Sequence, residues 1–134
     1  MNQKIVGYIT SNHLRDGYFP HQFQNLLIKN FVESNNAIFL LSWTGYKDRP
    51  TLAFDSLLLE NFYSGICFYS MEQILQFPDP LNYLYALKSR KIWVGFAKEN
   101  LFFHDDTGFK SVLKILWLMS CVSQTDPLEI LENR

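Results

Sequence analysis

Short apolar runs alternate with helical patterns along the chain, and this alternation limits the folds that the sequence can adopt. The runs at 5–9, 37–43, 65–69 and 92–97 have the length of strands. The run AIFLLSW, 37–43, shows no alternation of apolar and polar residues, as expected for a strand that is covered on both faces. Strands that alternate with helices predict an α/β fold: a three-layer sandwich with a mainly parallel sheet of four or five strands between helices.

The boundaries of the expected elements follow from these runs and from the helix signals between them. Pro20 suits the first turn of a helix, and Phe23, Leu27 and Phe31 then recur at spacings of four. The predicted strands are 4–10, 37–43, 65–69, 92–97 and a short fifth strand at 101–104. The predicted helices are 20–34, 51–62, 78–89 and 109–121. With no linker or repeat, the 134 residues predict one domain, 1–134, in which 122–134 form a tail or a short helix.

Polar residues directly follow the first predicted strand. The strand runs into Ser11, Asn12 and His13, and the next helix carries Gln24 and Asn25 in its first turns. Open parallel sheets place their ligand sites outside the carboxyl ends of the strands. We therefore predict a binding site here, lined by side chains, because the loop lacks the glycines with which a backbone wraps a pyrophosphate.

The other predicted strands also end in hydrogen-bonding residues. The carboxyl ends of neighbouring parallel strands face one crevice, so these side chains are expected to converge and to suit a polyhydroxylated ligand such as a sugar. The predicted ligand-binding residues are Asn12, His13, Gln24, Asn25, Ser42, Tyr46, Tyr69, Ser70 and Glu72. The alternative for each Ser and Asn is that it caps a turn or a helix.

Two carboxylates and one hydroxyl are the candidates for catalysis. Asp55 falls inside the apolar arc of the helix predicted at 51–62, where a carboxylate is unfavourable unless a partner or a ligand satisfies it. Such a group can act as a general acid or base, and Glu99 at the end of the fourth strand is a second candidate. Ser11 completes the set. The alternative is an ion pair or a capping role, which we favour for Glu72.

Several classes of site are not predicted. The sequence has no glycine-rich nucleotide loop, no GxSxG, no CxxC and no HExxH. His13, His21 and His104 are scattered. A lone loop histidine is more often a surface residue, with catalysis the less favoured alternative for His13 and His21, which flank the first loop. Cys67 and Cys121 lie in apolar patterns and are expected to be buried, reduced thiols. We therefore predict neither a metal site nor a bound cofactor. With 12 basic and 13 acidic residues, the chain lacks the charge for broad contact with nucleic acid.

The longest apolar segment indicates an interface rather than a membrane span. Residues 112–122 fall short of the ~20 residues that cross a bilayer and are interrupted by Lys114 and Ser120. The N-terminal residues lack the pattern of a secretory signal, so we expect a cytoplasmic protein. The helix predicted at 109–121 is apolar round most of its circumference, and a chain of this length has little with which to enclose it. A homo-oligomer that contacts through this helix is therefore expected.

Five segments together resemble a known family. The segments are GYITS, PHQFQNLLI, FLLSWTGY, GICFYS and FAKE, and between Val6 and Asp106 the chain resembles the small "sporadic carbohydrate cluster" proteins. The most specific part is the pair Gln24 and Asn25 after Pro20. The residues that match are Ser11, Pro20, Gln24, Asn25, Ser42, Tyr46, Tyr69, Ser70 and Glu99. Gly45 departs from the family, which has an acidic residue before this tyrosine.

A fainter likeness is to the catalytic domain of serine recombinases, which begins with a YxRxS strand and a glutamine-bearing helix. That chemistry needs arginines around the scissile phosphate. Thr10 stands in the place of the first arginine, and the segment SMEQ after Tyr69 has none. The likeness favours a resolvase-like or flavodoxin-like fold and argues against DNA cleavage.

The family resemblance implies a role in the biosynthesis of bacterial surface polysaccharide or unusual sugars. Our expectation is action on a sugar or nucleotide sugar by acid–base chemistry. The main alternative is a noncatalytic partner or regulatory subunit of a sugar-modifying enzyme, docked through the helix at 109–121. A nucleic-acid-processing relative of the resolvases is a third, less favoured hypothesis because the net charge is close to zero.

Overall fold

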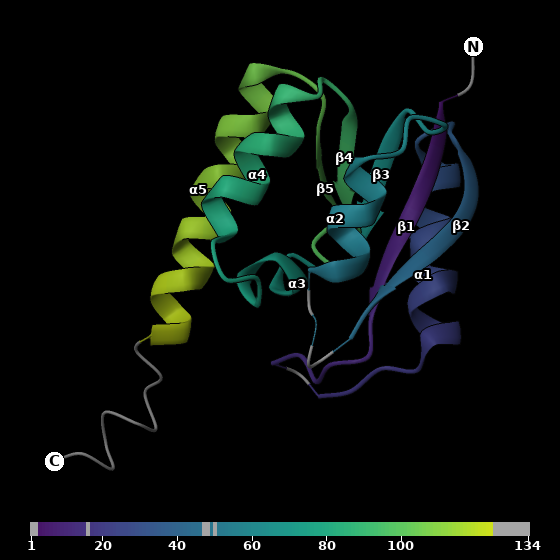
Figure 1. The fold of residues 1–134 in the computed structure, drawn as a ribbon. Coiled ribbons are helices and arrows are strands. Elements are labelled where there is room, and N and C mark those ends of the chain that lie inside the picture. Colours follow the sequence, from purple (N-terminus) through teal and green to yellow (C-terminus); the bar gives the residue numbers. More distant parts are fainter. Residues whose placement is uncertain (1–2, 16, 47–48, 50, 125–134) are drawn as a thin grey trace, which may run out of the picture.

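A single five-stranded sheet organises the molecule, in a computed structural model that describes residues 3–15, 17–46, 49 and 51–124. The strands are β1 (Lys4–Thr10), β2 (Ile38–Gly45), β3 (Gly65–Phe68), β4 (Trp93–Phe96) and β5 (Leu101–Phe103). They lie in the order β2-β1-β3-β4-β5; the first four are parallel and β5 is antiparallel to β4 (Figure 1). The predicted α/β class and the short fifth strand are confirmed.

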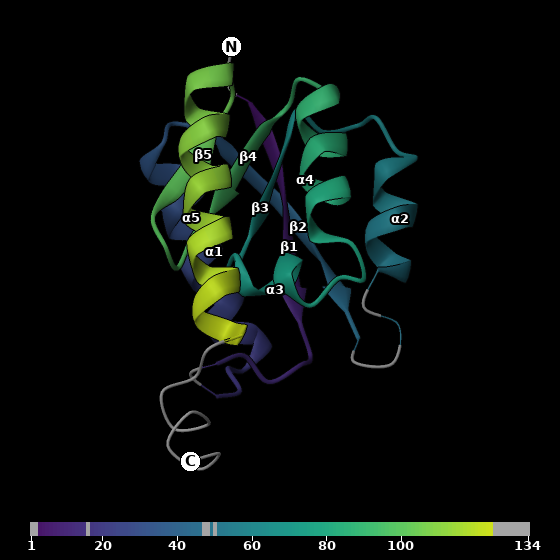
Figure 2. The same cartoon turned by 90° about the vertical axis from the view of Figure 1, so that its left-hand side faces the viewer.

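Helices cover the two faces of the sheet unequally. The helices are α1 (His21–Ser34), α2 (Leu52–Leu58), α3 (Glu72–Leu75), α4 (Pro80–Ser89) and α5 (Asp106–Gln124). In the described part of the chain, α1 covers one face, and α2, α4 and α5 cover the other (Figures 1 and 2). The short helix α3 lies near the carboxyl ends of the strands. None of these helices combines the length and the apolar character needed to cross a membrane.

The sheet separates two hydrophobic cores because side chains alternate between its faces along each strand. Val6, Tyr8 and Phe68 face the core below α2, α4 and α5, where Tyr8 packs edge-on against Phe54 with ring centres 5.4 Å apart. Ile5 and Ile9 face the smaller core below α1. The β1–β2 register shifts between Ile5 and Gly7, so the alternation of β2 is broken there.

Three helices differ from the prediction. α2 ends at Leu58 instead of near 62, because the guanidinium of Arg90 binds the carbonyl of Leu58 and, at 2.8 Å, that of Glu60, which satisfies the helix end. α3 was not predicted, since its four residues are too few for a periodic pattern. α5 begins at Asp106, where Asp105 accepts a hydrogen bond from the Gly108 N–H at 2.8 Å. Of the predicted tail, 125–134 lies outside the described residues.

Two burial predictions are wrong. The strand at 37–43 was expected to be covered on both faces, but β2 is an edge strand whose Ile38 and Leu41 are 42% and 51% exposed. Cys67 is buried as predicted, and burial raises the pKa of its thiol. Cys121 is partly exposed, because it lies on α5, which packs only one side against the sheet.

Candidate functional site

The crevice at which open α/β folds bind ligands is here filled by side chains. The chain leaves β1 toward β2 and returns past it to β3, so the topological switch point lies between the carboxyl ends of β1 and β3. Gln73 of α3 is buried in it: its Nε2 donates to the Tyr8 carbonyl (2.9 Å), and its Oε1 accepts from the Ser70 N–H (2.9 Å). The cavity left beside Asn12 and Gln76 has about 10 Å³, room for about one water molecule.

Asn12 and Gln76 close the mouth of this crevice. The Asn12 Nδ2 donates to the Gln76 Oε1 at 3.1 Å, and the Gln76 Nε2 donates to the His13 carbonyl at 3.0 Å. The Asn12 Oδ1 is buried, and the described residues offer it no hydrogen-bond partner. Since Asn12 borders the small cavity, a water there could satisfy this oxygen.

Gln24 anchors the first loop to β1. It is fully buried; its Oε1 accepts from the Thr10 N–H (2.9 Å), and its Nε2 donates to the carbonyls of Thr10 (2.9 Å) and Phe19 (2.7 Å). The amide thus takes the place that a neighbouring strand would hold beyond the end of β3. Because every one of these bonds goes to backbone, the Gln24 amide shapes the site and is not available to a ligand.

Ser11 and His21 meet where the end of β1 faces the first turn of α1. The Ser11 Oγ lies 3.3 Å from the His21 Nε2, and both residues are partly exposed. The Ser11 N–H donates to the Gly45 carbonyl at 2.9 Å, which holds Ser11 at the end of the β1–β2 ladder. A hydroxyl beside an imidazole can exchange a proton with it or with a ligand. The pair is therefore the candidate reactive centre of this edge.

A second polar pair continues along the same side of the sheet. Asn25 lies one helical turn after His21 on α1, and its Oδ1 accepts a hydrogen bond from the Ser42 Oγ at 2.5 Å. Both residues are partly exposed. The glycine at position 7 makes room for this pair, because a Cβ there would lie 2.3 Å from the Ser42 Oγ. Three predicted site residues therefore lie along the same side of the sheet: Ser11 after β1, Asn25 of α1 and Ser42 of β2.

Glu99 binds the start of α3. Its Oε2 accepts from the Ser70 hydroxyl at 2.8 Å, and its Oε1 accepts from the Met71 N–H at 2.9 Å. The Ser70 Oγ in turn accepts from the Glu72 N–H at 3.2 Å. The ends of β3 and β4 do converge as predicted, but the carboxylate acts there as a capping group for α3.

Glu72 has the ion-pair role that the sequence favoured. Its Oε1 lies 3.6 Å from the Lys98 Nζ, and its Oε2 accepts from the Arg15 N–H at 2.6 Å. Next to it, the Lys98 Nζ lies 5.8 Å from the centre of the Phe19 ring, which also packs against Tyr69. Tyr69 is buried, and its ring packs against the inner side of Phe19 in the loop between β1 and α1.

Asp55 is not in the predicted environment. The carboxylate was expected within an apolar helix face, but the residue is exposed, and its Oδ1 accepts from the Tyr83 hydroxyl at 3.0 Å. The helix is shorter than predicted, and its buried residues are Phe54, as expected, and Leu57. Asp55 lies on the side of α2 and α4, whereas Ser11 and His21 lie on the side of α1. The structure therefore does not bring Asp55 together with the Ser11–His21 pair.

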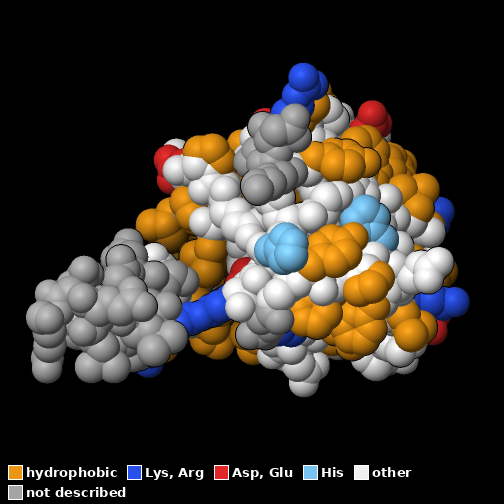
Figure 3. All heavy atoms as spheres, turned by 90° about the horizontal axis from the view of Figure 1, so that it is seen from below, with side chains coloured by type: hydrophobic (Ala, Val, Ile, Leu, Met, Phe, Trp, Pro, Cys, Tyr) orange, Lys and Arg blue, Asp and Glu red, His pale blue; other side chains and the backbone are white. Residues whose placement is uncertain are grey.

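The remaining predicted residues lie at the rim. His13 is exposed, with its ring 5.6 Å from that of Tyr18, and Tyr46 is 57% exposed beyond the end of β2. Seen from below, this end of the molecule shows histidine rings with hydrophobic side chains beside them (Figure 3). The rim therefore offers rings and polar groups to a ligand without a deep cavity.

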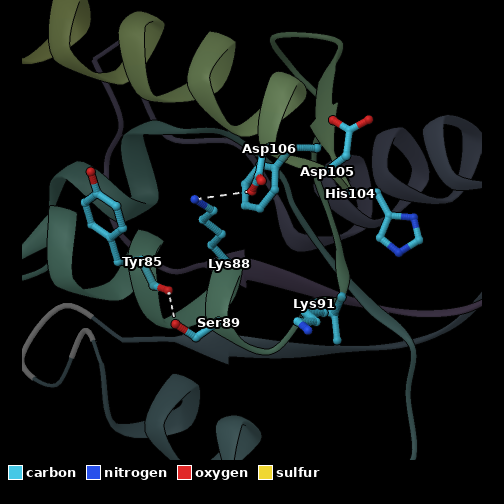
Figure 4. A pocket seen from close by; sticks show the side chains of 9 residues that line it. Tyr85, Lys88, Ser89, Lys91, His104, Asp105 and Asp106 are labelled. Atoms are coloured by element: carbon cyan, nitrogen blue, oxygen red, sulfur yellow. Dashed lines mark hydrogen bonds and ion pairs between the residues drawn. The ribbon is translucent and has the colours of Figure 1, made fainter.

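A larger hollow, of about 350 Å³, lies at the other end of the sheet between α4 and α5 (Figure 4). The Lys88 Nζ lies 3.4 Å from the Asp106 Oδ1 and 4.6 Å from the centre of the Phe109 ring. Asp105 is engaged by the start of α5. These charges already join the two helices, and the hollow contains none of the residues predicted for the site.

Metal ligands do not gather in the part of the chain that the structure describes: no group of three or more His, Cys, Asp or Glu side chains is placed to hold an ion. Comparison with protein-family models gives no match to this chain, and comparison with curated proteins gives none either. The family resemblance therefore stays a prediction.

Sequence reasoning missed two residues that shape this edge. A surface role was favoured for His21 over a catalytic one, although it stands at the start of a helix that faces the end of β1, and this placement was the available signal. Gln73 lies in a helix too short to predict, so nothing in the sequence indicated that it fills the crevice.

Proposed function

We propose that this protein takes part in bacterial surface carbohydrate biosynthesis in the cytoplasm and acts on a sugar or nucleotide sugar by acid–base chemistry. The observation that carries the proposal is the Ser11–His21 pair at the carboxyl end of β1. The resemblance to the sporadic carbohydrate cluster proteins supplies the substrate class. The His21 imidazole takes a proton from the ligand or gives one to it, and the Ser11 hydroxyl orients the imidazole ring.

The choice of His21 follows from the positions of the carboxylates. Glu99 caps α3, Glu72 pairs with Lys98, and Asp55 lies on the other side of the sheet. Imidazole is the side chain best suited to exchange protons near neutral pH. The proton-transfer role that the sequence gave to carboxylates is therefore moved to His21.

A polyhydroxylated ligand suits the groups beside this pair. Ser11, Asn25 and Ser42 provide hydroxyls and an amide along one line on the α1 side, all partly exposed. Such groups can donate to or accept from sugar hydroxyls. Because the rim is shallow, it favours binding of one sugar unit, and the rest of the ligand would stay in solvent.

The test compares a histidine of the proposed site with one at the other end of the sheet. His21→Gln should lower the conversion of the nucleotide sugar by about 100-fold or more, followed by NMR, because a general acid–base group contributes about this much. His104→Gln is the matched control, since His104 is exposed and lies beside the hollow at the other end of the sheet. Full activity of His21→Gln across a panel of nucleotide sugars would contradict the proposal.

The second candidate function is that of a noncatalytic partner of a sugar-modifying enzyme. It is favoured by α5, on which Trp117 and Leu118 are 62% and 47% exposed. A Trp117→Glu variant that lowers polysaccharide output in cells, while the isolated wild-type protein converts no sugar, would support this function over catalysis.

A further inference from the structure

β2 has the sequence of an enclosed strand but lies at the open edge of the sheet. Within the described residues its strand neighbour is β1 alone. Between Ile38 and Gly45 it carries no charged residue and no proline, two of the features with which edge strands prevent pairing with another chain, although its register with β1 shifts opposite Ile5–Gly7. Ile38, Leu40 and Leu41 are 42%, 36% and 51% exposed. An exposed, uncharged edge strand of this kind is a template for pairing with another chain, so we expect its free edge to be covered.

The surface beside β2 is apolar and hollowed. A depression of about 500 Å³ lies between the strand and the α2 region, with Trp43, Tyr46 and Phe62 among its walls. Tyr46 and Phe62 are 57% and 46% exposed. Leu59, at the end of α2, is 88% exposed. Apolar surface thus extends from the strand edge onto its flank, with room for side chains of a partner.

We propose that β2 pairs antiparallel with the β2 of a second copy of this chain, so that the two sheets join into one. The partners are related by a twofold axis perpendicular to the sheet, which makes identical edge strands antiparallel. The free N–H and C=O groups of β2 gain partners in the new ladder. Side chains of each copy enter the depression beside the other strand.

A second copy fits this edge because β2 is uncharged. Near a twofold axis a residue meets itself or a close neighbour, so any charge in β2 would face a like charge, which is destabilising between strands. A stable dimer buries about 1,200 Å² or more. The exposed rings of Tyr46 and Phe62 extend the contact beyond the ladder toward that size.

This interface is separate from the one predicted at α5. β2 and β5 are the two edges of the sheet, and α5 packs against β5. The two carboxyl edges in the β2-paired dimer point in opposite directions, so each copy keeps its own Ser11–His21 pair. A substitution on β2 and one on α5 therefore test two different assemblies.

The first experiment measures the mass in solution by light scattering and sedimentation. The wild-type chain should give twice its 15.8 kDa at micromolar concentration. Leu41→Lys, or Leu40→Lys if the first variant folds poorly by circular dichroism, should raise the dissociation constant by about tenfold or more through like-charge repulsion. Trp117→Lys, the matched change on α5, should leave the dimer intact.

The second experiment fixes the direction of pairing without adding charge. Single cysteines replace Leu40, Leu41 or Ile38 in a Cys121→Ser background. A cysteine at one of the two central positions should form an intermolecular disulfide, whereas Ile38→Cys should not, because antiparallel pairing places it against the far end of the partner strand. A wild-type mass of one chain, a dimer broken by Trp117→Lys alone, or failure of both central cysteines would overturn the proposal.

Discussion

Two buried glutamines hold the carboxyl end of β1 in place. Gln24 binds the N–H and carbonyl of Thr10, and Gln73 binds the Tyr8 carbonyl from the other helix layer. The Gln24 amide replaces a strand partner at Thr10, and the Gln73 amide adds a second donor to the Tyr8 carbonyl, which also accepts from the Tyr69 N–H at 3.2 Å. Their buried position makes them costly to change, because a lost partner leaves backbone groups unsatisfied.

Gln24→Met removes the amide but keeps the length of the side chain. Three backbone bonds are lost, and we expect the free energy of unfolding to fall by about 2–4 kcal/mol in urea titrations. Gln22→Met on the exposed side of α1 is the control and should change stability by less than about 0.5 kcal/mol. Equal effects of the two substitutions would show that the buried amide has no special role.

Because the phenol of Tyr8 is buried, we expect the protein to lose stability at high pH. Burial, with a smaller contribution from Asp55, raises the pKa of its phenol far above the usual value. At neutral pH both folded and unfolded states carry the neutral phenol. Above about pH 10 the unfolded chain loses the proton first, so stability falls by up to about 1.4 kcal/mol per pH unit.

Tyr8→Phe tests this titration by removing the phenol. Urea unfolding at pH 9, 10 and 11 should show a shallower decline for the variant, while the Cys67 thiol, whose pKa burial also raises, contributes equally to both proteins. Parallel declines in variant and wild type would assign the pH dependence to other groups.

At the scale of elements, α3 decides what the carboxyl edge offers. Its start is capped by Glu99, and its side chains close the switch-point crevice that the order of strands would otherwise leave open. The ligand-binding groups are consequently those at the rim between β1, β2 and α1. This is why the site is shallow, although the topology is that of a fold with a deep crevice.

β3 is packed between its neighbours with no room for a side chain at its start. A Cβ at Gly65 would lie 2.5 Å from the Ile5 Cδ1 and 2.6 Å from the Trp93 carbonyl oxygen. Gly65→Ala should therefore lower the free energy of unfolding by about 1–3 kcal/mol, since backbone must move. In Gly108→Ala the nearest atoms are 3.2 Å away and alanine favours the helix, so little change is expected. The comparison uses thermal and urea unfolding.

At the scale of the whole molecule, uncovered apolar surface lies at both edges of the sheet. At one edge, β2 exposes Ile38 and Leu41. At the other edge, α5 lies beside β5 and exposes Trp117. The sequence pointed to α5 as the interface because its helical pattern is apolar all round. The inward positions Phe109, Val112 and Leu116 are buried within the chain, which leaves α5 a narrower exposed stripe than the pattern suggested.

A β2-paired dimer predicts a melting temperature that depends on protein concentration. Association stabilises the folded state by mass action, so a tenfold rise in concentration should raise Tm by about 3 °C. Differential scanning fluorimetry over two decades of concentration measures this shift. Leu41→Lys should shift this dependence to protein concentrations about tenfold higher or more. A wild-type Tm that does not move with concentration would contradict the dimer.

The amino-acid pattern alone determined the α/β class, the positions of the five strands and the four longer helices. Period and polarity report which residues form a strand or a helix, because burial of one face or of both leaves a local trace. The same pattern correctly located polar residues at strand ends and the ion-pair alternative for Glu72. The pattern could not show which of these polar side chains would contact one another.

Tertiary structure decided the partners and the exposure of individual side chains. The sequence of β2 is that of a covered strand, and only the strand order placed it at an edge. Asp55 faces outward because Phe54 and Leu57 of α2 pack into the core, where Phe54 contacts Tyr8 and Phe68 of distant strands. His21 came to lie 3.3 Å from Ser11 because the Gln24 amide ties α1 to the end of β1. Contacts between distant segments leave no periodic signal in the sequence, and they set the geometry of the site.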